Sequence, residues 1–79
     1  MSRKVFVEVQ AKFDKNGNIV PLSIVWEDGT VYTVDRVLDI RKAASLKVGG
    51  AGIRYTCRIK GKATYLFLDE LTWFVEGKN

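Results

Sequence analysis

The sequence contains no histidine, a single cysteine and a single proline. Without histidine the chain cannot build a Ser-His-Asp triad, a histidine general base or a histidine metal site. The lone Cys57 excludes an internal disulfide and a multi-cysteine zinc site, and it fits a reducing cytoplasm. Catalysis by carboxylates or lysine stays open, but no spacing in the sequence indicates it. We therefore expect no catalytic residue, no metal and no cofactor, and predict that the protein is not an enzyme.

Long hydrophobic runs are also lacking. No apolar stretch reaches the roughly 18–20 residues that span a bilayer. The N-terminus, which begins Met1-Ser2-Arg3-Lys4, has no signal-peptide core. We expect a cytoplasmic protein without membrane contact. With 79 residues, 47% of them hydrophobic, the chain has enough apolar material for one small domain over 1–79.

Alternation of apolar and polar residues is the main pattern present, and it predicts an all-β fold. A first strand is expected over 5–13, with one apolar face made of Val5, Val7, Val9, Ala11 and Phe13. A second is expected over 19–26, where Leu22, Ile24 and Trp26 lie together. Because proline cannot donate to a strand ladder, Pro21 predicts an edge strand or a start after the proline.

Turn signals separate these segments. Asn16-Gly17 and Asp28-Gly29 supply the positive φ that tight reversals need, and Asp28-Gly29 is the clearest hairpin signal. The third strand, 31–40, loses its alternation near Asp35-Arg36, which predicts a bulge or bend. Residues 41–48 have no β character, so we expect a loop or a single helical turn there.

Three more strands are expected over 53–60, 63–68 and 72–76, with a Gly61-Lys62 turn between the first two. Five or six short strands joined by tight turns must curl to cover one core. The sequence thus predicts a small antiparallel barrel, SH3-like in the first instance, with an OB-like barrel as the alternative.

Basic residues are concentrated in 36–62, where eight lysines and arginines face a single acid, Asp39, for a net +7. The rest of the chain has five basic and eight acidic residues. A local excess of positive charge creates an electrostatic field that attracts nucleic acid, anionic lipid or an acidic protein. The charge alone does not distinguish among these partners.

The strand 53–60 carries the candidate site. Alternation places Tyr55, Cys57 and Ile59 inward, and Arg54, Thr56, Arg58 and Lys60 outward. Outward cations repeat at roughly 6.6 Å, a spacing that suits the phosphates of an extended strand. We expect Arg54, Arg58 and Lys60 to contact phosphates, with Lys47 and Lys62 flanking them. The alternative is an ordinary solvated face, which charged runs usually are.

Other motifs favour structural interpretations. The run 49–52 (GGAG) fits neither a P-loop nor a dinucleotide fingerprint, and is expected to be a flexible or positive-φ entry into the next strand rather than a phosphate loop. The acidic pairs Glu27-Asp28 and Asp69-Glu70 are expected to be turn residues rather than a cation site. Most of the nine aromatic rings are expected in the core, with Phe6 and one of Trp73 and Phe74 exposed.

The segments 26–32 (WEDGTVY), 44–55 (ASLKVGGAGIRY) and 73–76 (WFVE) together resemble a family of short bacterial proteins, mostly of Firmicutes, that has no assigned activity. The resemblance spans nearly the whole chain, and its most specific part is the Gly-Gly-x-Gly-x-Arg-Tyr block. It implies a stand-alone cytoplasmic β domain, and it identifies no site residue.

From these features we predict a non-enzymatic binding module that contacts nucleic acid through the basic side formed by residues 41–62. The same positive charge would also attract an acidic protein. The alternative class is a protein-interaction or oligomerisation domain, in which an edge strand, 5–13 or 72–76, pairs with a partner chain. The sequence leaves the oligomeric state open.

Overall fold

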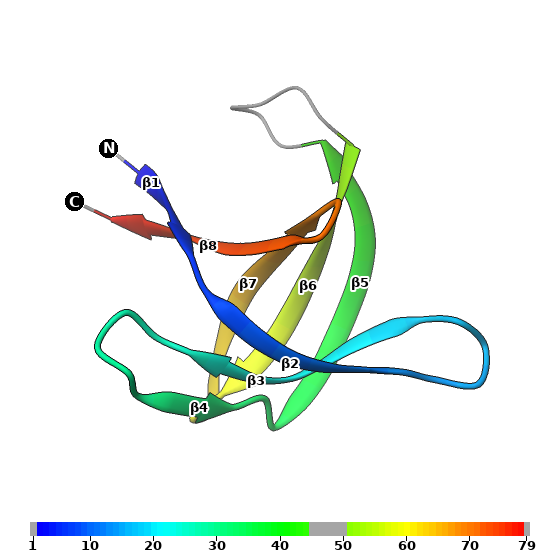
Figure 1. Ribbon diagram of the computed structural model, residues 1–79, viewed down its shortest axis with the longest axis horizontal. Helices are drawn as coiled ribbons and strands as arrows, with labels where there is room; N and C mark the ends of the chain where they lie inside the picture. Colours follow the sequence, from blue (N-terminus) through cyan, green and yellow to red (C-terminus); the bar gives the residue numbers. More distant parts are fainter. Residues whose placement is uncertain (1, 45–50, 79) are drawn as a thin grey trace.

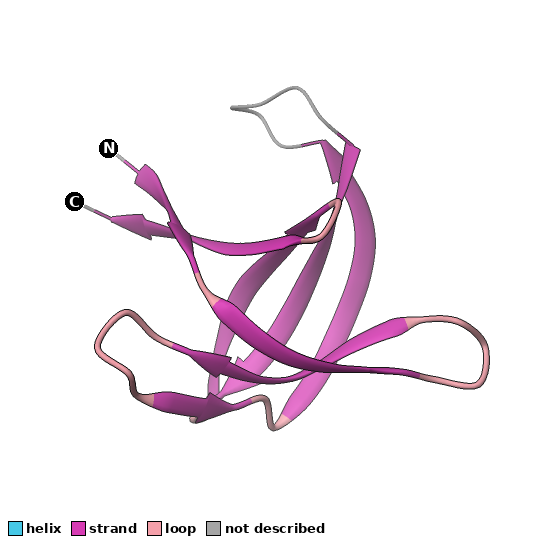
Figure 2. Ribbon diagram, in the orientation of Figure 1, coloured by secondary structure: helices cyan, strands magenta, loops and turns pink. Residues whose placement is uncertain are grey.

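Eight antiparallel strands in two sheets make up the part of the chain that the computed structural model describes, residues 2–44 and 51–78 (Figures 1 and 2). The five-stranded sheet has the order β1-β8-β7-β6-β5, and the three-stranded sheet the order β2-β3-β4. No helix, and hence none able to cross a membrane, occurs in these two ranges. The all-β prediction is confirmed. The strands are β1 (Ser2–Phe6), β2 (Glu8–Phe13), β3 (Ile19–Val25), β4 (Val31–Thr33), β5 (Arg36–Ala44), β6 (Ala51–Ile59), β7 (Lys62–Asp69) and β8 (Thr72–Lys78).

Two bent segments carry the chain from one sheet to the other. β1 runs into β2 through Val7, whose backbone N–H donates to the Trp73 carbonyl (3.1 Å) (Figure 1). β4 runs into β5 through Val34 and Asp35, whose N–H groups donate to the carbonyls of Leu22 (2.9 Å) and Arg58 (2.8 Å). The six expected segments therefore become eight strands, because two of them bend and split between the sheets.

All three predicted glycine turns are found, the third as a Lys60-Gly61 turn between β6 and β7 in which Gly61 has φ 77°. Gly17 (φ 84°) lies in the β2–β3 turn and Gly29 (φ 86°) in the β3–β4 turn. In the second turn the Trp26 N–H donates to the Thr30 carbonyl (2.8 Å), as expected for a tight hairpin. Only glycine adopts such φ values without steric cost, so the sequence signal and the geometry agree.

Both alternatives predicted from Pro21 are wrong, because β3 lies between β2 and β4 and begins at Ile19, before the proline. The proline is tolerated for two local reasons. β4 pairs only with Ser23–Val25, so it does not extend to Pro21. On the other side, the β2–β3 register shifts between Gln10 and Ala11, next to the pair Ala11–Pro21. A proline at such an irregularity removes no regular ladder hydrogen bond.

The predicted loop over 41–48 is also wrong in its first half, since Arg41 to Ala44 continue β5. The rest of that prediction, and Gly49 and Gly50 of the glycine run, lie outside the described residues. The expected irregularity near Asp35-Arg36 is found slightly later, as a register shift between Val37 and Asp39 in the β5–β6 pairing.

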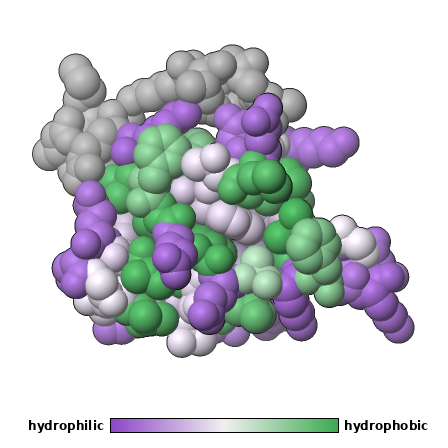
Figure 3. Space-filling model, in the orientation of Figure 1, coloured by the Kyte–Doolittle hydropathy of each residue, from purple (hydrophilic) through white to green (hydrophobic). Residues whose placement is uncertain are grey.

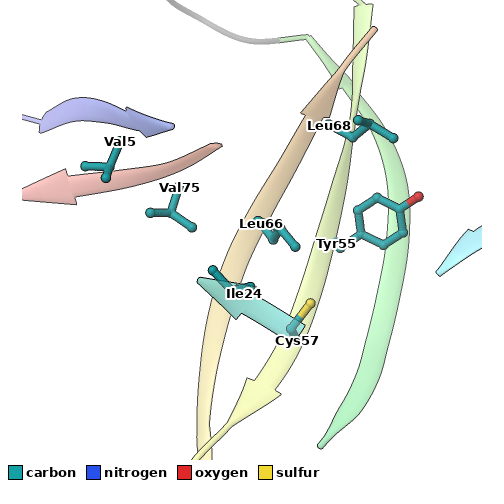
Figure 4. Packing of buried hydrophobic residues seen from close by; sticks show 7 residues of the cluster. All are labelled: Val5, Ile24, Tyr55, Cys57, Leu66, Leu68 and Val75. Carbon is teal, nitrogen blue, oxygen red and sulfur yellow. The ribbon is translucent and has the colours of Figure 1, made fainter. Parts of the chain in front are cut away.

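The core lies between the two sheets and is supplied by both (Figure 4). The side chain of Tyr55 reaches across it, and its hydroxyl donates to the Ile19 carbonyl (2.6 Å). The inward positions predicted for Tyr55 and Cys57 are confirmed, and Ile59 is half-buried. The buried cluster consists of Val5, Ile24, Tyr55, Cys57, Leu66, Leu68 and Val75.

The apolar face predicted for 5–13 reaches the core only in its first half. Val5 is buried and Val9 packs against the cluster, whereas Ala11 and Phe13 are exposed. The register shift at Gln10/Ala11 turns the end of β2 away, and the β2–β3 turn projects from the body of the molecule (Figure 1).

Candidate functional site

A bulge in β5 gathers four arginines on one face of the five-stranded sheet. In a regular strand, residues five positions apart point to opposite faces. The register shift between Val37 and Asp39 adds one residue, so that Arg36 lies opposite Arg58 and Arg41 lies opposite Arg54. Directly opposed residues share a face. Arg36, Arg41, Arg54 and Arg58, together called the arginine face below, therefore point away from the core.

The arginine face is poorly neutralised. Asp39 shares it, and accepts a hydrogen bond from the Arg41 Nε at 2.7 Å, which leaves a net +3 over five charged side chains. Like charges placed directly opposite one another destabilise an antiparallel sheet. Arg36 and Arg58, both exposed, form such a pair. The fold thus keeps an arrangement that costs stability and that a bound anion would relieve.

Arg54 is held by packing rather than by an acid. Its guanidinium lies over the Tyr65 ring, 4.7 Å from the centroid, and its Nε is buried without a hydrogen-bond partner among the described residues. A cation–π contact fixes the guanidinium plane while its other N–H groups stay available to an acceptor. Arg54 is therefore preorganised beside an aromatic ring that is itself 53% exposed.

Aromatic rings continue this face onto β7, β8 and β1. Phe67 lies opposite both Arg54 and Phe74, and Phe74 lies opposite Phe6. Phe67 and Phe74 stack with centroids 5.1 Å apart, and Phe6 meets Phe74 edge-on at 5.9 Å. The Lys4 ammonium lies 4.5 Å from the Phe74 centroid. The outer face therefore alternates between cations and rings.

The predictions for the aromatic residues are only partly confirmed. Phe6 is exposed, as expected (61%). The expectation that most rings fill the core is wrong, since Tyr55 alone belongs to the buried cluster. The prediction that Trp73 or Phe74 is exposed is wrong as well: Trp73 is half-buried, and Phe74 is buried on the outer face beneath its aromatic and lysine neighbours.

The structure brings together two of the five predicted site residues, Arg54 and Arg58. Lys60 does not extend their row, because it is a positive-φ turn residue (φ 51°) whose ammonium lies over the Tyr32 ring at 5.2 Å. Lys62 pairs with Ile59, on the core side of the sheet. Lys47 lies outside the described residues. Sequence reasoning missed Arg36 and Arg41 as site residues, although the slip in alternation was the signal that could have found them.

A pocket of about 470 Å³ opens beside the aromatic part of this face. The pairing of β7 with β8 ends at Phe67 and Phe74, after which β8 continues along β1. The two strands separate there, and side chains from the core side become accessible between them. The lining residues are Ile24, Trp26, Tyr32, Ile59, Thr64, Tyr65, Phe67, Val75 and Glu76. In the view of Figure 3, apolar side chains reach the surface in several places, separated by polar ones.

The acidic pairs Glu27-Asp28 and Asp69-Glu70 lie at turns, as predicted. Asp28 accepts a hydrogen bond from the Thr30 N–H (2.9 Å), and this bond holds the pKa of its carboxyl below the ordinary value. Asp69 and Glu70 stand at the β7–β8 turn, where Glu70 has φ 56°. Among the described residues, no three His, Cys, Asp or Glu side chains come together as a metal site would require.

Cys57 behaves as a buried apolar residue and not as a nucleophile. It is fully buried, and desolvation raises the pKa of its thiol to about 11. Because the unfolded thiol titrates near ~8.5, the neutral form is favoured on folding. This stabilisation is complete below about pH 8.5 and is lost as the pH rises toward 11, by about 3 kcal/mol.

Comparing urea unfolding of the wild type and Cys57→Ala from pH 8 to 11 checks this expectation. The wild type should lose more stability than the variant over that range, because the Cys57 thiol is the one titratable group that the two proteins do not share. Native Cys57 should also resist iodoacetamide at pH 8 and react once unfolded. Parallel pH profiles for the two proteins would contradict the assignment.

The two strands considered for edge pairing differ in how far they are open. Thr72–Glu76 belongs to β8, which pairs with β7 as far as Phe74 and with β1 from Phe74 onward, so each part of it is open on one side only. The segment 5–13 does supply edges, because β1 and β2 are each the outermost strand of their sheet. Phe13, in β2, is 75% exposed.

Comparison with family models, with curated proteins and with solved structures gives no match to this chain. The arrangement of its own residues is therefore what supports a function.

Proposed function

We propose that this chain is a non-enzymatic, cytoplasmic module that binds single-stranded nucleic acid on the arginine face and the rings beside it. The observation that carries the proposal is the cross-strand pair Arg36–Arg58, next to the pair Arg41–Arg54. Each pair places two arginine residues directly opposite one another on the outer face of the sheet. A row of phosphates offsets the repulsion within these pairs and accepts their N–H donors.

The rings favour a single strand over a duplex. Tyr65 and Phe6 are more than half exposed and lie on the same sheet face as the arginines. Unpaired bases stack on such rings, whereas the bases of a duplex are already stacked on each other. The combination of cations with exposed aromatic rings is typical of small β domains that hold single strands.

We also propose that the two sheets form one small barrel of the SH3-like type. Each extended segment pairs with the next along the chain, and β1 pairs with β8, the last strand. An OB-like barrel has Greek-key connections, which fit this consecutive pairing less well.

Fluorescence anisotropy of a labelled single-stranded oligonucleotide tests the binding proposal. Three or four phosphate contacts predict an affinity that falls about 20- to 50-fold between about 50 and 200 mM salt. The Kd at physiological salt should be about 10⁻⁴–10⁻⁶ M. An affinity that does not depend on salt concentration, or no binding at the lower salt, would overturn the proposal. An acidic protein would then be the partner to test.

The second candidate function, pairing of β2 with a partner strand, is supported by the exposure of Phe13 on an edge strand. It predicts a concentration-dependent dimer or a complex with an extended peptide. Light scattering over a range of protein concentrations tests the dimer: a constant monomer mass would exclude self-pairing.

A further inference from the structure

The pocket between β7 and β8 is continuous with the arginine face. Tyr65 connects the two, because its ring lines the pocket and also lies beneath the Arg54 guanidinium. Phe67 and Glu76 line the pocket from the outer side of the sheet, whereas Trp26 and Tyr32 line it from the core side. A strand held on the arginine face would therefore pass the mouth of this pocket.

We infer that the pocket accepts one unstacked base, preferentially guanine, of the single strand that the arginine face holds. This inference rests on the proposed function. The volume of about 470 Å³ is larger than a single base requires and leaves room for its sugar at the mouth. Trp26, Tyr32 and Tyr65 offer ring faces for stacking, which contributes to binding of any base.

Glu76 gives the pocket its selectivity. It is the one acidic side chain among the nine lining residues, and an ionised carboxylate only accepts hydrogen bonds. Guanine presents two neighbouring donors on its Watson–Crick edge, N1–H and the N2 amine, and the two carboxylate oxygens can accept both. Adenine and cytosine offer a single exocyclic amine on that edge. Because the Watson–Crick edge is occupied in a duplex, the pocket selects single strands.

A cation also lies beside one of the lining residues. The Lys60 ammonium is 5.2 Å from the centroid of Tyr32, which lines the pocket from the core side.

The experiment compares oligothymidylates of about nine nucleotides that carry guanine, adenine or an abasic site at the centre. Affinities are measured by anisotropy at one salt concentration. We expect the guanine strand to bind about tenfold more tightly than the adenine strand, since a bidentate pair discriminates against the wrong base by about that factor, and the abasic strand to bind most weakly. Intrinsic fluorescence should change on binding of the guanine strand, because Trp26 lines the pocket.

Glu76→Gln is the decisive variant, because it keeps the size of an exposed side chain and removes its charge. It should abolish the preference for guanine over adenine. Glu8→Gln, at an exposed position of β2 away from the pocket, is the matched control and should keep the preference. Both variants raise the net charge equally, so a general gain in affinity cancels in the guanine-to-adenine ratio.

The outcomes separate the two proposals. Equal, salt-sensitive affinities for guanine, adenine and abasic strands, unchanged in Glu76→Gln, would overturn the base pocket and leave the arginine face as a phosphate-binding surface. A preference for guanine that survives in Glu76→Gln would overturn the role of the carboxylate. Failure of all strands to bind at low salt would remove both proposals, and a peptide or a small apolar molecule would become the expected occupant.

Discussion

Arg58→Glu is expected to stabilise the fold and, at the same time, to weaken binding of a single-stranded oligonucleotide by on the order of 20- to 50-fold at about 50 mM salt. Residue 58 lies directly opposite Arg36, so the substitution converts a like-charge cross-strand pair into an oppositely charged one. Such an exchange raises the free energy of unfolding by a few tenths to about 1 kcal/mol. It also lowers the charge of the arginine face by two, which reduces the salt slope by about 1.4.

Urea unfolding and anisotropy titration of the same protein sample check both halves. Lys12→Glu is the matched control, because Lys12 is an exposed strand residue opposite Val20 and makes the same change in net charge. The control should bind nearly as the wild type does and should show no gain in stability. If Arg58→Glu lowered both binding and the free energy of unfolding, the substitution would be damaging the fold. The claim that the opposed arginines lower the stability of the wild type would then be contradicted.

Leu66→Ala is expected to destabilise the protein by about 3 kcal/mol. Leu66 is fully buried in the cluster that joins the two sheets, where it lies opposite Tyr55 of β6 (Figure 4). The loss combines the transfer free energy of the removed methyl groups with the cavity that remains. For a domain of this size, with about 4–12 kcal/mol in total, much of the stability would be gone.

Leu71→Ala provides the control, since Leu71 stands in the β7–β8 turn and is 91% exposed. The same chemical change there should alter the urea midpoint hardly at all. If the two substitutions had similar effects, or if Leu66→Ala cost less than about 1 kcal/mol, the sheets would not share the core described above.

Much of the fold could be predicted from local patterns. The Asp28-Gly29 hairpin, the Asn16-Gly17 turn and the inward Tyr55 and Cys57 depend on turn chemistry and on alternation within one strand, both of which are local. These features need no knowledge of what lies across the sheet, and the sequence therefore predicts them.

The candidate site was harder to predict because it depends on register between strands. The sequence showed that alternation fails after Val34, but only the pairing of β5 with β6 shows that the extra residue brings Arg36 and Arg41 to one face. The same limit applies to Phe74, which alternation assigns to the outer face and which its neighbours bury.

The pocket has a similarly non-local origin. It exists because β8 leaves β7 after Phe74 and pairs instead with β1, and this exchange involves the two ends of the chain. No run of residues in β7 or β8 marks the point of separation. The sequence therefore could not show that the carboxylate of Glu76 lines a pocket.

The most direct measurement is a ¹H–¹⁵N correlation spectrum recorded during titration with a single-stranded oligonucleotide. We expect the largest shifts on the outer face of β5, β6 and β7, at the arginine face and Tyr65, and no change in the β2–β3 turn over 14–18. Shifts confined to β2 and that turn, or spread evenly with no saturation, would contradict the claim that the arginine face is the binding surface.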